Sequence, residues 1–259
     1  MKLLTLVLAA AVGAQAQSIA PPTCAHGSPA RSHPSASDLL KMQEKFASDA
    51  TVLLSPEPVG NMTLLRYQVR DYADCTGNSG CYWSDLDAQT RRADAVLESA
   101  VKSAPRAAKL AIVLDIDETS LSSYCEEIRE DFGYIPAMND PWIVSAEAAV
   151  PVPGTVRLAA HAQALGVSVF FITGRPERQR EATAQNLKLA GYSDWKHLSL
   201  RQTADVGVAT GMFKAAERQK IVDAGYRIVL NMGDQWSDLD GAPMAEHSIK
   251  LPNPFYYLP

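Results

Sequence analysis

The sequence has little cysteine, few aromatic residues and no excess of positive charge. Only 4 of its 259 residues are cysteine, 7% are aromatic, and the 24 basic residues are outnumbered by 29 acidic ones. Without a basic face we expect no nucleic-acid partner. No apolar stretch reaches the ~20 residues of a membrane-spanning helix, so we expect no stable membrane anchor. The hydrophobic share, 47%, still suffices for one sizeable globular core.

Several catalytic signatures are also missing. No cysteine is followed six positions later by arginine, which excludes the phosphate loop of cysteine-based phosphatases. The five histidines are scattered along the chain and include no Arg-His-Gly motif of histidine phosphatases. There is also no glycine-rich loop of the Walker type, which excludes a nucleotide hydrolase of that class.

Residues 1–16 have the pattern of a secretory signal peptide. One lysine precedes a short apolar run over residues 3–12, and Ala-Gln-Ala at 14–16 supplies an A-x-A cleavage site. The alternative is a buried N-terminal helix. We predict a periplasmic or secreted protein whose mature chain begins at Gln17. Cys24 lacks the preceding small residue that a lipid-anchored cysteine needs.

The four cysteines predict two disulfides, because an even number in an exported protein favours bridges over metal ligands. Cys75 and Cys81 flank the turn-rich segment Thr-Gly-Asn-Ser-Gly, which would bring their Cβ atoms together. We predict that these two are linked. Cys24 and Cys125 are then the pair left by elimination.

The residues before 109 divide into two parts. Residues 17–36 are rich in Pro, Ser, Ala and His and are typical of a flexible leader. Apolar residues at helical spacing begin near Ser37 and recur from Ala93 to Val101. Residues 55–85 follow no clear pattern. We predict a mainly helical lobe over residues 37–108.

Residues 109–259 alternate apolar runs with helical segments. The predicted strands cover residues 110–114, 167–172, 197–200, 226–232 and 248–251. The predicted helices cover residues 155–165, 176–190 and 213–224. This alternation predicts an α/β fold, a Rossmann-like parallel sheet with helices on both faces. The segment 120–153 is too long for a simple connection, so we expect a small cap insertion there.

A polar cluster follows each of the three long strands. These clusters are D-I-D-E-T at 115–119, T-G-R at 173–175 and G-D-Q-W-S-D at 233–238. Ligands of open α/β sheets bind beyond the carboxyl ends of the strands, so we expect the three clusters to meet. Residues i and i+2 of an extended chain share a face, which would point Asp115 and Asp117 into one pocket.

This set of residues suits phosphoryl transfer. One aspartate can attack phosphorus while the other protonates the leaving oxygen and later takes a proton from water. Converging carboxylates and a phosphate dianion require a divalent cation, and oxygen ligands favour Mg²⁺, with Asp234 as a further ligand. The hydroxyl of Thr173 and the ammonium of Lys214 could hold the phosphoryl oxygens.

Plainer roles stay open for these residues. The two leading aspartates could cap a helix, and residues 173–175 could form only a strand-to-helix turn, with Arg175 in a structural role. Lys214 could be a solvated surface lysine. Asp238 could be a helix N-cap as well as a support for the metal site.

Together the motifs resemble those of the haloacid dehalogenase superfamily: D-I-D-E-T, F-F-I-T-G-R, Lys214 and G-D-Q-W-S-D. More narrowly, the sequence resembles the subfamily IIIB acid phosphatases, which include bacterial lipoprotein acid phosphatases and plant vegetative storage proteins. The narrower resemblance rests on residues 191–201, 225–229 and 250–257, and the whole covers roughly residues 37–259.

The resemblance implies a role for each matching position. Asp115 would be the nucleophile, and Asp117 would be the general acid/base and offer its backbone carbonyl to the metal. The implied substrate-binding residues are Thr173, Gly174 and Lys214. The implied Mg²⁺ residues are Asp115, Asp117, Asp234 and, as a support for the site, Asp238.

We therefore predict an exported, Mg²⁺-dependent acid phosphatase that hydrolyses small-molecule phosphate esters through a phosphoaspartate at Asp115. One alternative is an exported nucleotidase or phosphotransferase with the same site. Another is a non-catalytic storage or binding protein on this fold. A dehalogenase of the same superfamily is not expected to keep Asp117. The sequence carries no signal for an oligomeric state.

Overall fold

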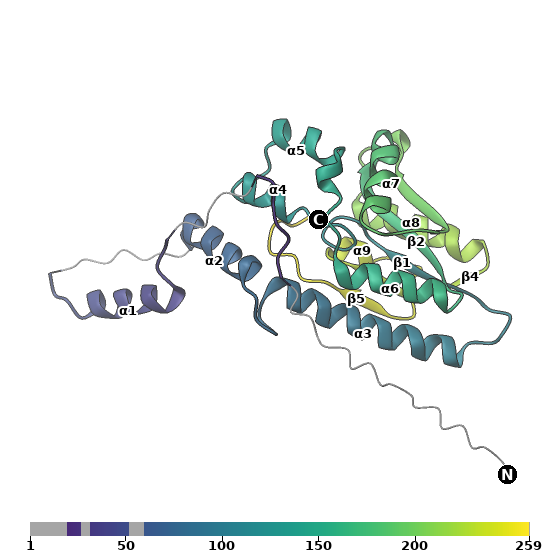
Figure 1. Ribbon diagram of the computed structural model, residues 1–259, viewed down its shortest axis with the longest axis horizontal. Helices are drawn as coiled ribbons and strands as arrows, with labels where there is room; N and C mark the ends of the chain where they lie inside the picture. Colours follow the sequence, from purple (N-terminus) through teal and green to yellow (C-terminus); the bar gives the residue numbers. More distant parts are fainter. Residues whose placement is uncertain (1–19, 27–31, 52–59, 259) are drawn as a thin grey trace, which may run out of the picture.

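The computed structural model describes residues 20–26, 32–51 and 60–258 (Figure 1). The predicted signal peptide, residues 1–16, lies outside the described residues, as does part of the predicted leader. Within the described ranges, no helix combines the length and the apolar character needed to cross a membrane.

The centre of the fold is a five-stranded parallel sheet with the strand order β3-β2-β1-β4-β5. The strands are β1 (Lys109–Leu114), β2 (Ser168–Pro176), β3 (His197–Arg201), β4 (Tyr226–Gly233) and β5 (Ser248–Lys250). All five predicted strands and the parallel α/β fold are confirmed. The central strand β1 pairs with β2 on one side and β4 on the other, which explains its uninterrupted apolar sequence.

Helices cover both faces of this sheet (Figure 1). One face packs on α3 (Tyr82–Ser103), α6 (Pro153–Ala164) and α7 (Arg180–Leu189), and the other on α8 (Thr210–Asp223). Ile112 and Leu114 belong to the first core cluster, whereas Ala111 and Val113 belong to the second, as the alternation of a strand requires. The second predicted helix begins later than expected, because β2 continues to Pro176 and a 3-10 turn (Glu177–Gln179) precedes α7.

Two helices precede α3 in the described part of the chain, α1 (Ala36–Ala47) and α2 (Met62–Asp74). Residues 55–85, which include α2, follow no clear pattern in the sequence, so this helix was not predicted. Its N-cap was the available signal, since Oδ1 of Asn61 accepts hydrogen bonds from the backbone N of Thr63 and of Leu64. Leu86 and Leu97 of α3 enter the same core as the sheet. The division between a helical lobe and the core near residue 108 stays a prediction.

We call the connection from β1 to α6 the insertion, and its role as a cap stays a prediction. It contains α4 (Tyr124–Arg129), α5 (Pro136–Ile143) and a 3-10 turn (Ala146–Ala148), and Figure 1 shows α4 and α5 together beside the sheet.

Both predicted disulfides are present. Cys75 and Cys81 close the turn between α2 and α3, with Cα atoms 5.4 Å apart. Cys24 and Cys125 join the N-terminal segment to α4, with Cα atoms 5.3 Å apart. The second bridge ties residues 20–26 of the predicted leader to the insertion.

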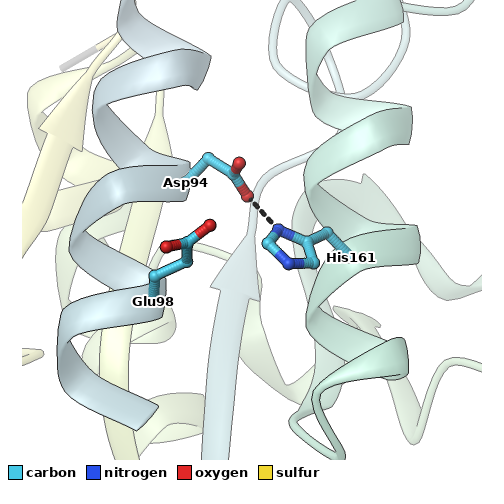
Figure 2. Close-up of side chains that lie close together, drawn as sticks. All are labelled: Asp94, Glu98 and His161. Atoms are coloured by element: carbon cyan, nitrogen blue, oxygen red, sulfur yellow. Dashed lines mark hydrogen bonds and ion pairs between the residues drawn. The ribbon is translucent and has the colours of Figure 1, made fainter. Parts of the chain in front are cut away.

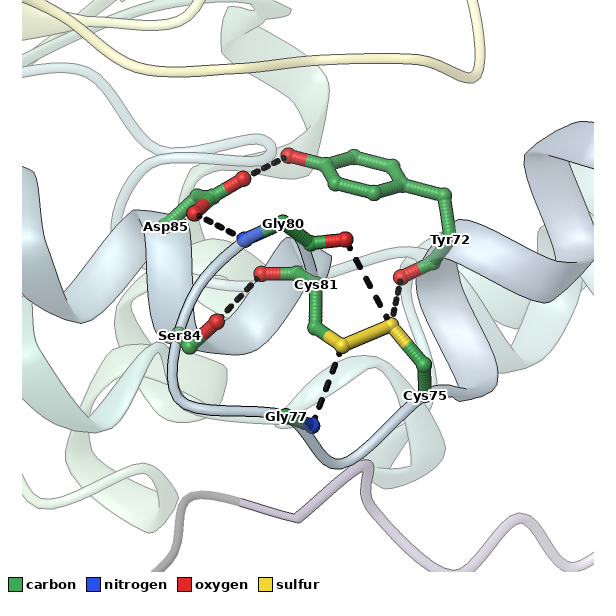
Figure 3. The surroundings of a disulfide bond; sticks show 7 residues. All are labelled: Tyr72, Cys75, Gly77, Gly80, Cys81, Ser84 and Asp85. Carbon is green, nitrogen blue, oxygen red and sulfur yellow. Dashed lines mark hydrogen bonds between the residues drawn. A yellow bond between two sulfur atoms is a disulfide. The ribbon is translucent and has the colours of Figure 1, made fainter.

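Hydrogen bonds fix the turn around the first disulfide (Figure 3). The carboxylate of Asp85, in the first turn of α3, accepts from the backbone N of Gly80 at 3.1 Å and from the hydroxyl of Tyr72 at 2.9 Å. The angle between α2 and α3 therefore depends on Asp85 as well as on the bridge.

The helices α3 and α6 approach so closely that one position must be glycine. A Cβ on Gly154 would lie 2.9 Å from Cβ of Thr90 and closer still to its Oγ1. Gly211 in α8 has no such restriction, because the nearest atom to a Cβ there would be 3.7 Å away.

We predict that Gly154→Ala lowers the free energy of unfolding by about 1–3 kcal/mol, the usual cost of overpacking. Urea unfolding would measure the change. The matched control Gly211→Ala should be neutral or stabilising by up to about 1 kcal/mol. Adding Thr90→Ala to Gly154→Ala should recover part of the loss. A Gly154→Ala protein as stable as the wild type would contradict this account of α3–α6 packing.

Candidate active site

Three buried aspartates meet at the carboxyl ends of β1 and β4. Asp115 follows β1, Asp234 follows β4, and Asp238 lies in the short helix α9 (Trp236–Leu239). One carboxylate oxygen from each lies within 4.8 Å of those of the other two. They meet because β1 and β4 are neighbours in register, with Leu114 opposite Met232. We call Asp115, Asp234 and Asp238 the aspartate cluster.

Lys214 places its ammonium group in the aspartate cluster. The residue lies in the second turn of α8 and is only 4% exposed, so it is not the solvated surface lysine considered above. Its Nζ donates to Oδ1 of Asp115 at 2.5 Å and also to Asp238. Burial alone would lower the pKa of Lys214, but the carboxylates of Asp115 and Asp238 raise it above its ordinary value. Lys214 therefore stays protonated at neutral pH.

The aspartate cluster still carries more negative charge than Lys214 offsets. Burial, and then the charge of Asp238, raises the pKa of Asp115 well above its ordinary value, and the same two causes raise the pKa of Asp234. A divalent cation would remove this penalty for ionisation. A set of buried carboxylate oxygens is the ligand set that Mg²⁺ prefers, so these residues fit that ion.

Asp238 is not a helix N-cap, which was one of its two predicted roles. The N-cap of α9 is Gln235, and Asp238 is three residues further on, where its Oδ2 accepts from the backbone N of Gln235 at 2.7 Å. Asp238 thus closes a capping box with one oxygen while its other oxygen bonds Lys214.

Asp117 lies outside the aspartate cluster and bonds Arg175. Nε of Arg175 is 3.1 Å from both carboxylate oxygens of Asp117, and Nη2 is 2.6 Å from Oδ1. Arg175 is buried and also donates from Nη1 to Oγ1 of Thr183 in α7. The side chain of Asp117 is 30% exposed, so its carboxylate faces solvent, where a leaving group could depart. The structural role expected for Arg175 is thus to hold Asp117.

Thr173 and Gly174 lie at the carboxyl end of β2. Thr173 is fully buried, and its Oγ1 accepts from the backbone N of Arg175 at 3.1 Å. The hydroxyl hydrogen can therefore be donated to a phosphoryl oxygen. Gly174 is exposed, and a Cβ there would meet nothing within 4 Å. This end of β2 is open to solvent above a buried hydroxyl.

A separate hollow of about 1210 Å³ lies between α8 and α9, with Met212, Trp236 and Met244 among its lining residues. Neither Asp115 nor Asp234 lines it. Because phosphoryl chemistry needs the carboxylates, we place the candidate site at the aspartate cluster.

The profile of the HAD superfamily, subfamily IIIB (acid phosphatase), matches residues 36–259. The chain belongs to this family. The resemblance found in the sequence motifs is therefore confirmed.

Relatives of this subfamily IIIB chain carry two kinds of name. Acid phosphatase 1 of Solanum lycopersicum is 40% identical over 155 residues, which cover 56% of this chain and 58% of that protein. Vegetative storage protein 1 of Arabidopsis thaliana is 34% identical over 151 residues, which cover 57% of this chain and 55% of that protein. The matches thus span a little over half the length of these curated relatives.

A class C acid phosphatase from Bacillus anthracis has a similar structure, with a TM-score of 0.61 and 25% sequence identity. The match covers 75% of this chain and 86% of that one. It supports the same α/β fold for the two proteins.

Three side chains hold Asp234 in this subfamily IIIB chain, and the sequence pattern did not connect them to it. Nδ2 of Asn253 donates to Oδ2 of Asp234 at 2.8 Å, Nε2 of Gln235 to the same oxygen at 2.7 Å, and Oγ1 of Thr119 to Oδ1 at 3.1 Å. Oδ1 of Asn253 in turn accepts from the backbone N of Phe255 at 2.8 Å. Asn253 belongs to a motif that carried the family resemblance, but nothing in the sequence pattern linked it to Asp234.

The contacts of Glu118 were not indicated by the sequence pattern either. Its side chain is fully buried; one oxygen accepts from the backbone N of Ser123 at 2.5 Å, and the other from the hydroxyl of Tyr256 at 2.5 Å. Burial, and then the charge of Asp234, raises the pKa of Glu118 to about 8. Glu118 joins the start of the insertion to the C-terminal segment.

We predict that Asn253→Ala weakens Mg²⁺ binding about 10–100-fold, because it removes a hydrogen bond that orients Asp234. Calorimetric titration with Mg²⁺ would measure the affinity. The control Asn78→Ala, in the exposed turn of the first disulfide, should bind Mg²⁺ like the wild type. Unchanged Mg²⁺ affinity in Asn253→Ala would show that the C-terminal segment does not support the site.

Proposed function

We propose that this chain is a Mg²⁺-dependent acid phosphatase that hydrolyses small-molecule phosphate monoesters with Asp115 as the nucleophile. The observation that carries the proposal is the contact of 2.5 Å between Asp115 and Lys214 inside a cluster of three buried aspartates. Family membership supports the reaction class, as do the names of the tomato and Bacillus anthracis proteins. A related Bacillus anthracis structure has tungstate bound, which is consistent with a site for a tetrahedral oxyanion.

In the first step a carboxylate oxygen of Asp115 attacks phosphorus, and the bond from phosphorus to the ester oxygen breaks. Asp117 gives its proton to that leaving oxygen, so the alcohol departs neutral. Lys214 counters the negative charge around Asp115 during the approach of the phosphate. The hydroxyl of Thr173 donates to a phosphoryl oxygen.

In the second step water attacks the phosphorus of the phosphoaspartate. Asp117, now ionised, takes a proton from that water, and the bond from phosphorus to Asp115 breaks to release inorganic phosphate. Both carboxyl groups return to their starting protonation states. Arg175 holds Asp117 in place in both steps, through the contacts at 2.6 and 3.1 Å.

When bound, Mg²⁺ supplies positive charge that offsets the repulsion between the carboxylates and the phosphate. The groups that would hold it are the carboxylates of Asp115 and Asp234 and the backbone carbonyl of Asp117. Asp238 would support the site through Lys214 and the start of α9.

The two neighbouring aspartates should respond differently to substitution. Asp115→Asn removes the nucleophile, so turnover should fall to background for every ester. Asp117→Asn should cost an alkyl phosphate about 10²–10⁴-fold in formation of the phosphoaspartate. The same step with 4-nitrophenyl phosphate should lose much less, because nitrophenolate leaves without protonation. Single-turnover kinetics with both esters would measure how much of the rate each ester loses in the Asp117→Asn variant.

The control Asp223→Asn, an exposed residue at the end of α8, should leave both rates unchanged. Substantial turnover by Asp115→Asn, or equal losses for the two esters in Asp117→Asn, would contradict the assigned roles. A wild-type protein that binds phosphate but hydrolyses neither ester would favour the storage or binding alternative, which the vegetative storage relatives represent. Transfer of phosphate to an added alcohol would favour the phosphotransferase.

We also propose that the protein is exported to the periplasm or the cell exterior. Two disulfides support this, because such bridges persist in oxidising compartments. N-terminal sequencing of the exported protein should begin at Gln17, and retention of Met1 would contradict the proposal.

A further inference from the structure

A second group of metal-binding side chains lies between α3 and α6, and none of its members belongs to the aspartate cluster. Asp94 and Glu98 are one turn apart on α3, and His161 faces them from α6 (Figure 2). One ligand atom from each residue lies within 4.8 Å of the other two. Nδ1 of His161 is 2.6 Å from Oδ1 of Asp94. Both carboxylates and the imidazole point into one gap between the helices (Figure 2).

Solvent reaches the side chains on both sides of this gap. The side chains of Asp94 and His161 are 40% and 34% exposed. An ion that keeps water ligands must be reached from solvent, and the exposed fractions of these two side chains allow such access.

The gap also lies away from the aspartate cluster. His161 is six residues beyond Thr155, about 9 Å along the helix, and Thr155 bonds the loop that carries Asp117. The gap is thus distinct from the candidate active site.

The charges around the gap favour a cation. Asp94 and Glu98 are like charges at an i, i+4 spacing, which is destabilising on a helix surface. Lys102 is 3.1 Å from Glu98, but its side chain is 76% exposed, so this pair offsets little. A dication between the three side chains would remove the repulsion and use the imidazole nitrogen as a ligand.

The fold holds the two sides of the gap at a fixed separation. Gly154 lets α6 approach Thr90 of α3, and Arg157 of α6 forms an ion pair with the buried Asp87 of α3. Binding an ion therefore requires small side-chain rotations and leaves the helices in place. Such preorganisation is what a metal site on rigid elements needs.

We propose that Asp94, Glu98 and His161 bind a divalent transition-metal ion, with Zn²⁺ as its best-suited occupant. Zinc binds imidazole nitrogen and carboxylate oxygen at about 2.0–2.2 Å, which places tetrahedral ligand atoms about 3.4 Å apart. This separation falls within the 4.8 Å spread of the three side chains. Mg²⁺ prefers an all-oxygen shell, so this site and the aspartate cluster select different ions. The bound ion links α3 to α6.

Equilibrium dialysis with Zn²⁺ tests the proposal, in an Asp234→Asn background that removes a ligand of the aspartate cluster. The Asp234→Asn protein should take up one Zn²⁺ at micromolar free metal. Adding His161→Gln or Glu98→Gln should weaken Zn²⁺ binding at least about tenfold, because the loss of a group that merely orients a metal ligand already lowers metal affinity by about that factor. The matched control is His247→Gln, an exposed histidine outside the group, and it should bind like the background.

Thermal unfolding supplies a second readout on the protein with an intact aspartate cluster and saturating Mg²⁺. Zn²⁺ should raise the Tm of the wild type and of His247→Gln, because binding to the folded state stabilises it. It should not raise the Tm of His161→Gln. Equal Zn²⁺ uptake with and without His161 would overturn the proposal, as would no uptake at micromolar Zn²⁺. His161→Gln could also lower the stability without Zn²⁺ while Zn²⁺ uptake stays unchanged. The pair of His161 with Asp94 would then be purely structural, and the proposal would be overturned.

Discussion

The structure depends on the crowding of three buried carboxylates around one ammonium group. Removing a carboxylate from water is costly unless it is paired and hydrogen-bonded, and here the ammonium of Lys214 bonds two of the three, Asp115 and Asp238. The parallel pairing of β1 with β4 brings Asp115 and Asp234 together. Lys214 comes from α8, which covers one face of the sheet. This arrangement leaves an excess of negative charge, so the site suits a divalent cation, and an oxyanion substrate can approach only when such a cation offsets that charge.

Much of the remaining chain orients these charged groups. Arg175, at the end of β2, holds Asp117 apart from the aspartate cluster and toward solvent. The C-terminal segment returns to the site after β5, where Asn253 bonds Asp234 and Tyr256 bonds Glu118. Residues from β2 and from the C-terminal segment thus fix three carboxylates, those of Asp117, Asp234 and Glu118, that lie far from them in the sequence. A change in the tail is expected to affect the site although the tail contains none of the reacting groups.

The strands and the leading aspartates could be predicted from the sequence because their signals are local. Continuous apolar runs indicate strands buried on both faces, and a polar cluster directly after such a run must lie at the edge of the sheet. The contacts that position the site are not local. Arg175 meets Asp117 across 58 residues and Lys214 meets Asp115 across 99, and no periodicity encodes such pairings. The same holds for His161 and Asp94, which come together only because α3 and α6 pack side by side. Helix α2 was missed for a local reason, since the turn residues and cysteines around it concealed the N-cap at Asn61.

The central claim is that Asp115 carries the phosphoryl group between substrate and water. The most direct measurement is acid quench of Asp117→Asn during turnover of 4-nitrophenyl phosphate, followed by mass spectrometric mapping of the phosphorylated peptide. In this variant the intermediate should accumulate, because the substituted amide cannot take the proton from the attacking water. The phosphate should be on Asp115, within the segment that follows β1. Phosphate on any other residue, or complete turnover with no phosphorylated protein at any quench time, would contradict the role of Asp115 as nucleophile.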